Sequence, residues 1–301
     1  MINRSDYVET FSQKSSFGSE VWSILGEIEQ RIKHKVESIG VPLKEWDVEI
    51  YRGVLTGCND AFIITSIKRN EILNNCITEE ERQKTAELIR PILRGRDIKR
   101  YSYDFADQYI IATFPSKQYN IDEYQSLKSY LLSFGREKLE QTGKEYMING
   151  ETVKARKKTN NKWFETQDSI SYWDEFSKPK IVWGNLNVCG SYAITSEDMF
   201  INAPACMIVP GNNYLLAVLN SKIADFYIRT LGVVRNGGFF EYKPMFVEQI
   251  PIPQITEETR MQIDTILASS LSREDKDAKI DEILVKIYGL SEDEIIFLRN
   301  Q

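Results

Sequence analysis

Apolar residues recur every three or four positions near both ends of the chain, with charged residues between them. This spacing predicts one amphipathic helix over residues 19–39, which Gly40 and Pro42 should end. Ser291 and Glu294 have the spacing of a capping box, in which two free backbone N–H groups of a helix start are satisfied reciprocally. The same periodicity predicts three short C-terminal helices, over residues 256–270, 275–288 and 291–299.

Between the two ends, segments with a strand pattern are mixed with segments of helical periodicity. Residues 144–161 are polar and basic, which predicts an exposed hairpin or loop. Helices are predicted over residues 79–93, with an interruption at Pro91, and over 121–141 and 214–231. Strands are predicted over residues 46–50, 61–67, 108–114, 180–183 and 205–209.

The predicted strands and helices do not alternate regularly, and no Gly-x-Gly-x-x-Gly sequence follows a strand. This argues against a doubly wound nucleotide-binding fold. We therefore predict an α+β protein, with a mixed α/β domain flanked by an N-terminal amphipathic helix and a C-terminal helical tail. The expected boundaries are a helical lead-in over residues 1–45, the mixed domain over 46–254 and a helical segment over 255–301.

Charge is distributed unevenly along the chain. The 301 residues carry a net charge of −6, which taken alone weighs against a nucleic-acid partner. Two short segments are nevertheless strongly basic. Residues 84–101 have six basic and two acidic side chains, and residues 154–162 have five basic side chains and no acidic one. Because salt screens charges beyond about 8 Å, such segments can bind a polyanion within an acidic protein.

The residues that most catalytic and metal sites need are few. His34 is the only histidine and lies in a charged helical run, so Ser-His-Asp and Cys-His chemistry are not expected. The four cysteines are far apart, which gives no support to a zinc site. Nuclease-type acid-x-Lys pairs begin at Asp97, Glu274 and Asp277, but no partner acid can be named. Without a long apolar run or a signal peptide, we expect a cytoplasmic protein and no membrane partner.

Four motifs follow one another along the chain. They are IYRGVLTGCNDAFII at residues 50–64, IRPILRGRDIKRY at 89–101, KPKIVW at 178–183, and LAVLNSK at 216–222 followed by IPIP at 250–253. In this order and spacing they resemble the TaqI-like C-terminal specificity domain. That domain is the target-recognition part of adenine-specific type II methyltransferases and of fused restriction-methylation enzymes. Residues 35–43 and 287–295 are also similar to the family, so the resemblance covers almost the whole chain.

The resemblance implies a bacterial DNA-binding module of a restriction-modification system, with double-stranded DNA as its partner. Methyltransferases of the family carry an Asn-Pro-Pro-Tyr-type motif for the flipped adenine and a glycine-rich turn for S-adenosylmethionine, and we find neither here. We therefore expect no catalytic residues and no cofactor in this chain. S-adenosylmethionine would bind an associated methyltransferase domain or subunit, with or without a nuclease domain.

We expect DNA contacts from the two basic segments and from a flexible basic turn. Arg94 and Arg96 flank Gly95, and an arginine fork can bind two acceptors of one guanine. Lysines serve phosphates without sequence information, whereas asparagine can recognise an adenine edge. The expected DNA-binding residues are Arg90, Arg94, Arg96, Lys99, Arg100, Lys154, Arg156, Lys157, Lys158, Asn160, Asn161, Lys162, Arg235 and Asn236.

Other interpretations of the same sequence stay open. Residues 90–100 also fit a solvated surface that is partly paired with Asp97 and Asp104. Residues 154–163 also fit a disordered charged loop. For residues 56–59 we favour a structural turn over a polar loop that faces DNA. The whole chain also fits a fragment or split subunit that carries the methyltransferase's name, or a protein-interaction subunit that does not bind DNA.

Overall fold

The computed structural model describes residues 25–195, 198–231, 234–235 and 237–301. At its centre are the strands β2 (Glu49–Arg52), β10 (Lys180–Trp183), β12 (Tyr192–Thr195) and β14 (Cys206–Val209). They form one antiparallel sheet in the order β12-β10-β14-β2. The first strand lies three residues later than the sequence predicted, and the two predicted buried strands are present.

Both faces of this central sheet are covered. Along β10, Ile181 and Trp183 enter one hydrophobic core, whereas Val182 between them enters another. Ile208 and Met207 of β14 divide in the same way. Because successive side chains point to opposite faces, a strand buried on both sides is apolar almost throughout. Burial on both faces therefore explains the short apolar runs of β10 and β14 in the sequence.

Helices cover one face of the central sheet. The covering layer contains the elements α2 (Glu27–Ile39), β1 (Gly40–Pro42), α8 (Asn213–Leu219), α9 (Lys222–Leu231), β17 (Pro251–Pro253), α11 (Glu257–Ala268), α12 (Arg273–Ile287) and α13 (Glu292–Arg299). β1 and β17 pair antiparallel, which joins the two ends of the chain. Ile32, Ile263, Leu284 and Leu298 are buried in the same core. Residues 25–45 and 255–301 therefore pack in one helical layer.

Two predicted helices differ in the structure. α2 begins at Glu27, so residues 25 and 26 of the predicted helix are not helical; residues 19–24 lie outside the described part. The helix predicted over 214–231 is divided into α8 and α9. Asn220, between them, exchanges two hydrogen bonds of 3.0 Å with the backbone of Tyr192, which ties the break to β12.

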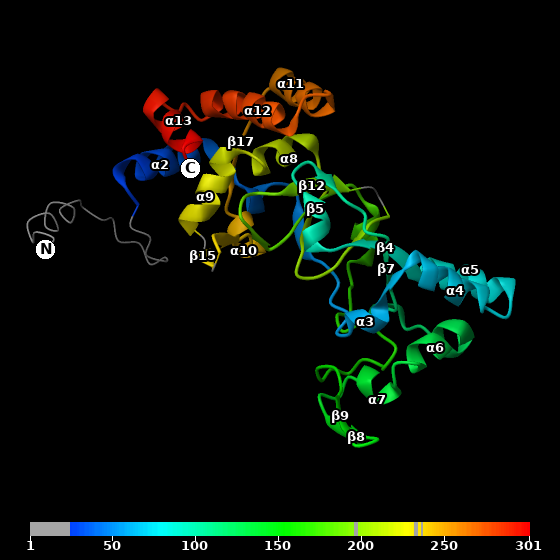
Figure 1. The fold of residues 1–301 in the computed structure, drawn as a ribbon. Helices are drawn as coiled ribbons and strands as arrows, with labels where there is room; N and C mark the ends of the chain where they lie inside the picture. The colour runs from blue at the N-terminus through cyan, green and yellow to red at the C-terminus, as the bar shows by residue number, and fades with distance from the viewer. Residues whose placement is uncertain (1–24, 196–197, 232–233, 236) are drawn as a thin grey trace, which may run out of the picture.

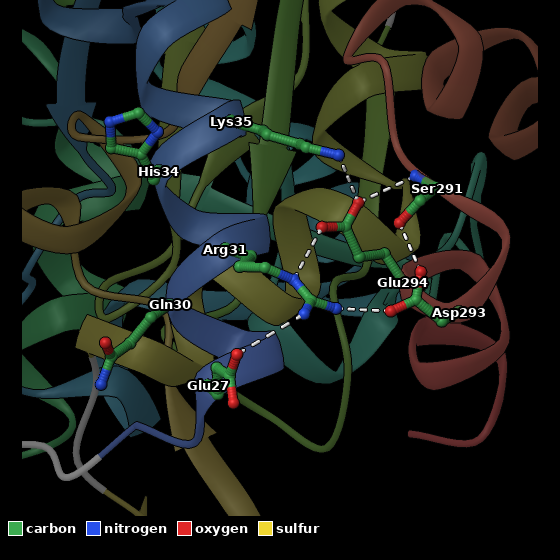
Figure 2. A pocket seen from close by; sticks show the side chains of 8 residues that line it. All are labelled: Glu27, Gln30, Arg31, His34, Lys35, Ser291, Asp293 and Glu294. Carbon is green, nitrogen blue, oxygen red and sulfur yellow. Dashed lines mark hydrogen bonds and ion pairs between the residues drawn. The ribbon is translucent and has the colours of Figure 1, made fainter. Parts of the chain in front are cut away.

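Ion pairs fasten α2 to α13 beside a hollow of about 560 Å³. Figure 2 shows Arg31 and Lys35 of α2 facing Asp293 and Glu294 of α13. Glu294 is buried; its carboxylate lies 2.8 Å from the Lys35 ammonium and accepts the Ser291 N–H at 2.8 Å, which confirms the predicted capping box. Three carboxylates and two cations line this hollow, so it offers little attraction to a polyanion.

A second sheet borders the other face of the central one. Its strands are β3 (Ile63–Thr65), β4 (Ile89–Leu93), β7 (Gln108–Ile111) and β13 (Phe200–Ile201), in the order β13-β4-β7-β3. The helix predicted over residues 79–93 is wrong in its last third, because the chain changes from α5 (Glu79–Leu88) directly to β4. Pro91 lies within the strand, opposite Tyr109. Proline lacks an N–H and disfavours helix at the residue before it, so the predicted interruption at Pro91 corresponds to a change from helix to strand.

A third core lies under the helices α3 (Asn59–Phe62), α4 (Ser66–Asn74), α5, α6 (Gln125–Leu132) and α7 (Arg136–Leu139). The strand predicted over 61–67 is only three residues long, with helices on both sides. The helix predicted over 121–141 is interrupted at Gly135, whose φ of 85° lies in the left-handed region. Glycine adopts this conformation at little cost, which separates α6 from α7.

Smaller elements complete the fold. They are β5 (Ile98–Lys99), β6 (Ser102–Tyr103), β8 (Glu145–Ile148), β9 (Glu151–Lys154), β11 (Leu186–Asn187), β15 (Val234–Arg235), β16 (Phe239–Glu241), α10 (Pro244–Val247), and 3₁₀ turns at Leu43–Glu45, Gly95–Asp97, Pro115–Lys117, Ile121–Glu123 and Trp173–Ser177. β8 and β9 form the hairpin predicted within residues 144–161. No helix in the described parts is long and apolar enough to cross a bilayer.

The elements are arranged along one long direction (Figure 1). Helices α11 to α13 lie at one end, the sheets in the middle, and the β8–β9 hairpin at the opposite end. The structure combines helices with several open sheets, which confirms the predicted α+β class. The hairpin end carries the second basic segment, and the helical end carries the acidic C-terminal helices.

Candidate nucleic-acid interface

The first basic segment lies on β4 and the turn after it. Arg94 binds Asp97 with both ends of its fork, since Nε donates to Oδ2 and Nη2 donates to Oδ1, each at 2.8 Å. This hydrogen bonding raises the pKa of Arg94. Burial opposes the charge on Asp97, but the hydrogen bonds from Arg94 outweigh it and lower the pKa of this carboxyl. A bidentate contact between Arg94 and guanine would have to break this pair, so in this structure Arg94 holds the turn.

Three further cations of the segment differ in their surroundings. Arg90 donates to the Asp198 carboxylate at 3.2 Å. Arg96 and Lys99 are exposed, and the Lys99 ammonium donates to the Arg96 carbonyl at 3.0 Å. Neither forms an ion pair with any residue that the structure describes. The first segment therefore presents two uncompensated cations to solvent, Arg96 and Lys99.

Arg100 connects the segment to helix α12 rather than to solvent. Its side chain is 13% exposed, and its Nε donates to the Asp277 carboxylate at 2.9 Å. Nη1 and Nη2 donate to the carbonyls of Gly190 and Asn220. Asp277 also accepts the Tyr101 hydroxyl at 2.7 Å. The predicted DNA contact of Arg100 is therefore corrected to a structural role, because its donors are spent on the helical layer.

A neighbouring carboxyl of α12, Asp281, makes stability depend on pH. Its oxygen accepts the Lys222 N–H at 3.0 Å, and burial raises its pKa to about 6 despite this bond and the nearby Arg100. The unfolded value is about 3.9, so the folded state binds more protons between pH 4 and 6. Stability is therefore lost as the pH rises through this window and stays lower at neutral pH.

We expect Asp281→Asn to raise the free energy of unfolding by about 1–2 kcal/mol at pH 7.5, because asparagine keeps the acceptor without the buried charge. The gain should shrink toward zero near pH 4, where the native carboxyl is protonated. Urea unfolding followed by tryptophan fluorescence at both pH values measures it. Glu282→Gln is the control, since Lys286 lowers the pKa of this exposed neighbour. An equal gain at both pH values would contradict the assignment.

The second basic segment is organised around Arg156, which is only 5% exposed. Its Nε donates to the Leu139 carbonyl at 2.8 Å, and Nη2 donates to the Trp163 carbonyl at 2.6 Å. Nη1 donates to the carbonyls of Thr56 at 2.9 Å and Glu165 at 2.8 Å. Burial lowers the pKa of Arg156 to about 10, so it remains charged at neutral pH. The predicted DNA contact of Arg156 is corrected: it is an interior residue that joins four chain segments.

The loop that follows Arg156 is held by its own polar groups. The Gln141 side chain donates to the carbonyls of Lys162 and Glu165 and accepts the Thr159 hydroxyl at 2.8 Å. Asn161 donates to the carbonyls of Thr166 and Gln167, at 3.2 and 2.9 Å. Asn161 is therefore engaged inside the protein, whereas the neighbouring Asn160 is exposed.

Lysines project into solvent from the end of β9 and from this firmly held loop. We call the exposed residues Lys154, Lys157, Lys158 and Lys162 the basic platform. None of the four forms an ion pair within the described part of the chain, although many other surface cations here do. Their positive charge is thus uncompensated, and the backbone beneath them is fixed. Such an arrangement suits a polyanion, because little ordering is needed when it binds.

The comparison with protein families agrees with the motifs. Residues 90–252, just over half of the chain, match the TaqI-like C-terminal specificity domain. The chain belongs to this family. This confirms the resemblance predicted from the sequence. No curated protein sequence matches the chain.

Two solved structures share the fold of this specificity domain. The type IIG restriction endonuclease BpuSI matches it with a TM-score of 0.50 and 14% identity, over 87% of this chain and 33% of the other. The type IIL restriction-modification enzyme MmeI, solved in complex with DNA, matches with a TM-score of 0.55 and 11% identity, over 87% and 36%. The chain thus spans about a third of each of these larger chains.

The remaining predicted contacts of the specificity domain are Arg235 of β15 and Asn236, and the predicted structural turn lies in the loop that leads into α3. Arg235 forms an ion pair with Glu241, whose pKa is lowered by hydrogen bonds from Lys243 and Arg235. Asn236 lies outside the described residues. In residues 56–59, the Thr56 hydroxyl donates to the Asn59 side chain at 2.7 Å and accepts the Cys58 N–H, as a structural turn should.

Sequence reasoning missed two features of the specificity domain. Lys144 is exposed at the start of the hairpin, close to the basic platform, yet it lies ten positions before the predicted cluster. Gln141 and Glu165 hold the platform loop, although nothing in their spacing marks them. Across the described residues no group of three His, Cys, Asp or Glu side chains is placed to hold a metal ion.

Proposed function

We propose that this specificity domain binds double-stranded DNA and selects the target of an adenine-specific methyltransferase in a bacterial restriction-modification system. The observation that carries the proposal is the basic platform, four exposed lysines without an ion pair in the described part of the chain, at the end of β9 and on the loop that buried Arg156 holds. Family membership supports it, and so does the MmeI structure, a DNA complex of the same fold.

In this mechanism the domain contributes binding alone. The platform lysines and the exposed pair Arg96 and Lys99 set its register on phosphates, while uncharged or acceptor side chains contact base edges. A methyltransferase domain, on the same or another chain, holds S-adenosylmethionine and turns the adenine out of the duplex. A nuclease domain can be part of the same enzyme. The complex acts in the cytoplasm, where the DNA is.

Binding by the isolated chain should be strongly salt-dependent. If Arg96, Lys99 and three or four platform lysines contact phosphate, the slope of log affinity against log salt should be about −5. Fluorescence anisotropy with a labelled random-sequence duplex between 50 and 200 mM NaCl measures this slope. The same chain with labelled S-adenosylmethionine should transfer no methyl group to the duplex. A slope near zero would contradict DNA binding, and sustained methyl transfer would contradict the binding-only role.

A further inference from the structure

The β8–β9 hairpin is a two-stranded ribbon with a tight, well-formed turn. Four residue pairs join the strands, from Glu145 opposite Lys154 to Ile148 opposite Glu151. Asn149 and Gly150 form the turn with φ values of 50° and 83°. Positive φ at both positions is typical of a type I′ turn, whose twist matches the strands. Figure 1 shows the ribbon at the end of the molecule opposite the C-terminal helices.

The base of the ribbon is rigidly joined to the basic platform. The Gly143 N–H donates to the Arg156 carbonyl at 2.9 Å, and the Ala155 N–H donates to the Lys144 carbonyl at 2.9 Å. The ladder therefore continues beyond the two named strands to Arg156, whose side chain is anchored in the interior. A ligand that contacts the platform lysines consequently meets the ribbon in a fixed direction.

Charge is separated along the length of the ribbon. Its base carries Lys144, Lys154, Lys157 and Lys158, all exposed. Beyond the pair of Glu145 and Lys154, the outer residues 146–152 contain no basic side chain and one acidic one, Glu151. Met147 is 71% exposed, opposite Thr152. The tip is therefore unsuited to phosphate, but it offers acceptor, hydroxyl and apolar groups.

The dimensions of the ribbon fit a DNA groove. Four residue steps lead from Lys154 to Gly150 of the turn, which is about 14 Å in an extended strand. The major groove is about 12 Å wide and 8.5 Å deep and admits a two-stranded ribbon. A ribbon whose base lysines lie at the phosphate rims would therefore reach the base edges with its tip.

We infer that the β8–β9 hairpin enters the major groove and that Met147, Asn149, Glu151 and Thr152 determine which base pairs are preferred. The inference rests on the proposed function and makes it specific. Met147 suits a thymine methyl group, and Glu151 suits the amino group of cytosine. Asn149 and Thr152 supply hydrogen-bonding groups to adenine or to other base edges. Arg94 is the weaker candidate for this task, since its fork is occupied by Asp97.

The test uses duplexes that the full chain selects from a random pool. Glu151→Gln, Thr152→Ala and Met147→Ala should each lose about 5- to 150-fold discrimination at one or two base positions. The salt slope should stay unchanged, because none of these residues contacts phosphate. The three side chains are partly or largely exposed, so unchanged circular dichroism and melting temperature confirm folding. As a matched control, Ser133→Ala on the α6 side should alter neither quantity.

Guanine N7 methylation interference supplies a second measurement, since N7 lies in the major groove. Wild type should exclude duplexes methylated at the selected guanines, and a variant with all three tip substitutions should accept them. Salt-dependent binding with no selected sequence, or with preferences that the variants leave intact, would overturn the hairpin assignment while the proposed function stands. Absence of salt-dependent binding by wild type would overturn both.

Discussion

Replacing Arg156 with alanine should lower the free energy of unfolding by about 3–5 kcal/mol. Four backbone carbonyls, those of Leu139, Thr56, Glu165 and Trp163, would lose a charged donor at once. A buried group left without a partner costs about 1–3 kcal/mol, and water entering the gap recovers part of this. The guanidinium also lies 5.0 Å from the centre of the Phe62 ring, so packing is lost as well.

Urea unfolding, followed by circular dichroism, measures this loss. Arg156→Lys keeps the charge but cannot reach all four carbonyls with one ammonium group, so it should fall between the wild type and Arg156→Ala. Lys157→Ala is the matched control, because the adjacent side chain is exposed and its removal should change stability by less than about 0.5 kcal/mol. A loss below 1 kcal/mol for Arg156→Ala would contradict its role as the anchor of the platform.

Local patterns predicted those elements whose environment is uniform along their length. α12 and α13 have one buried face and one solvated face, so their periodicity is visible in the sequence. β10 and β14 are short and buried on both faces, with flanking breaks. In such segments, residues on the same face are all buried or all exposed, so the local sequence predicts the element without knowledge of its distant contacts.

Prediction from periodicity failed where one apolar run contained both a helix and a strand. The chain changes from helix to strand between Leu88 and Ile89, and both residues are buried in the same core. An apolar residue in a core has no preference that distinguishes the two states, so periodicity cannot place the boundary. Pro91 marked a break, but whether a helix kinks or a strand begins is decided by pairing with β7, which lies almost 20 residues later.

The sequence indicated which two basic segments form the candidate site, but not which of their cations are exposed. The sequence shows the basic clusters directly. Whether a given cation is available to a ligand depends on the ion pairs and hydrogen bonds that it forms within the protein. Asp97 lies three positions from Arg94, so that pair was foreseeable. The partner of Arg100 is Asp277, which only the packing of α12 brings near. Arg156 stands in a run with lysines, and no local signal separates the buried cation from the exposed ones.

The net charge of −6 weighs against DNA binding only if the charges are evenly distributed, and in this structure the acidic and basic regions are far apart. Residues 254–301 hold eleven acidic and six basic side chains, and their helices lie at the end of the molecule opposite the hairpin. At physiological salt, charges farther apart than about 8 Å are largely screened from each other. A duplex at the basic platform would therefore experience the local lysines rather than the sum over the chain.

Replacing Lys157, Lys158 and Lys162 together with alanine should weaken binding to every duplex by about 100-fold at 0.15 M salt, at about 1 kcal/mol per phosphate contact. The salt slope should become shallower by about three units, since each lost contact removes about 0.9. Anisotropy titrations at several salt concentrations, with selected and random duplexes, measure both quantities. Sequence preference should remain, because lysine serves phosphate beside any base.

The matched control for this prediction replaces Lys84, Lys128 and Lys286 with alanine. It makes the same change in net charge, but these lysines lie within 2.9 Å of carboxylates of Glu80, Asp122 and Glu282. Cations already neutralised by neighbours release few counterions from DNA, so this variant should bind within about threefold of wild type. If both triple variants weaken binding equally, affinity follows total charge rather than the platform, and the DNA would have to lie elsewhere on the domain.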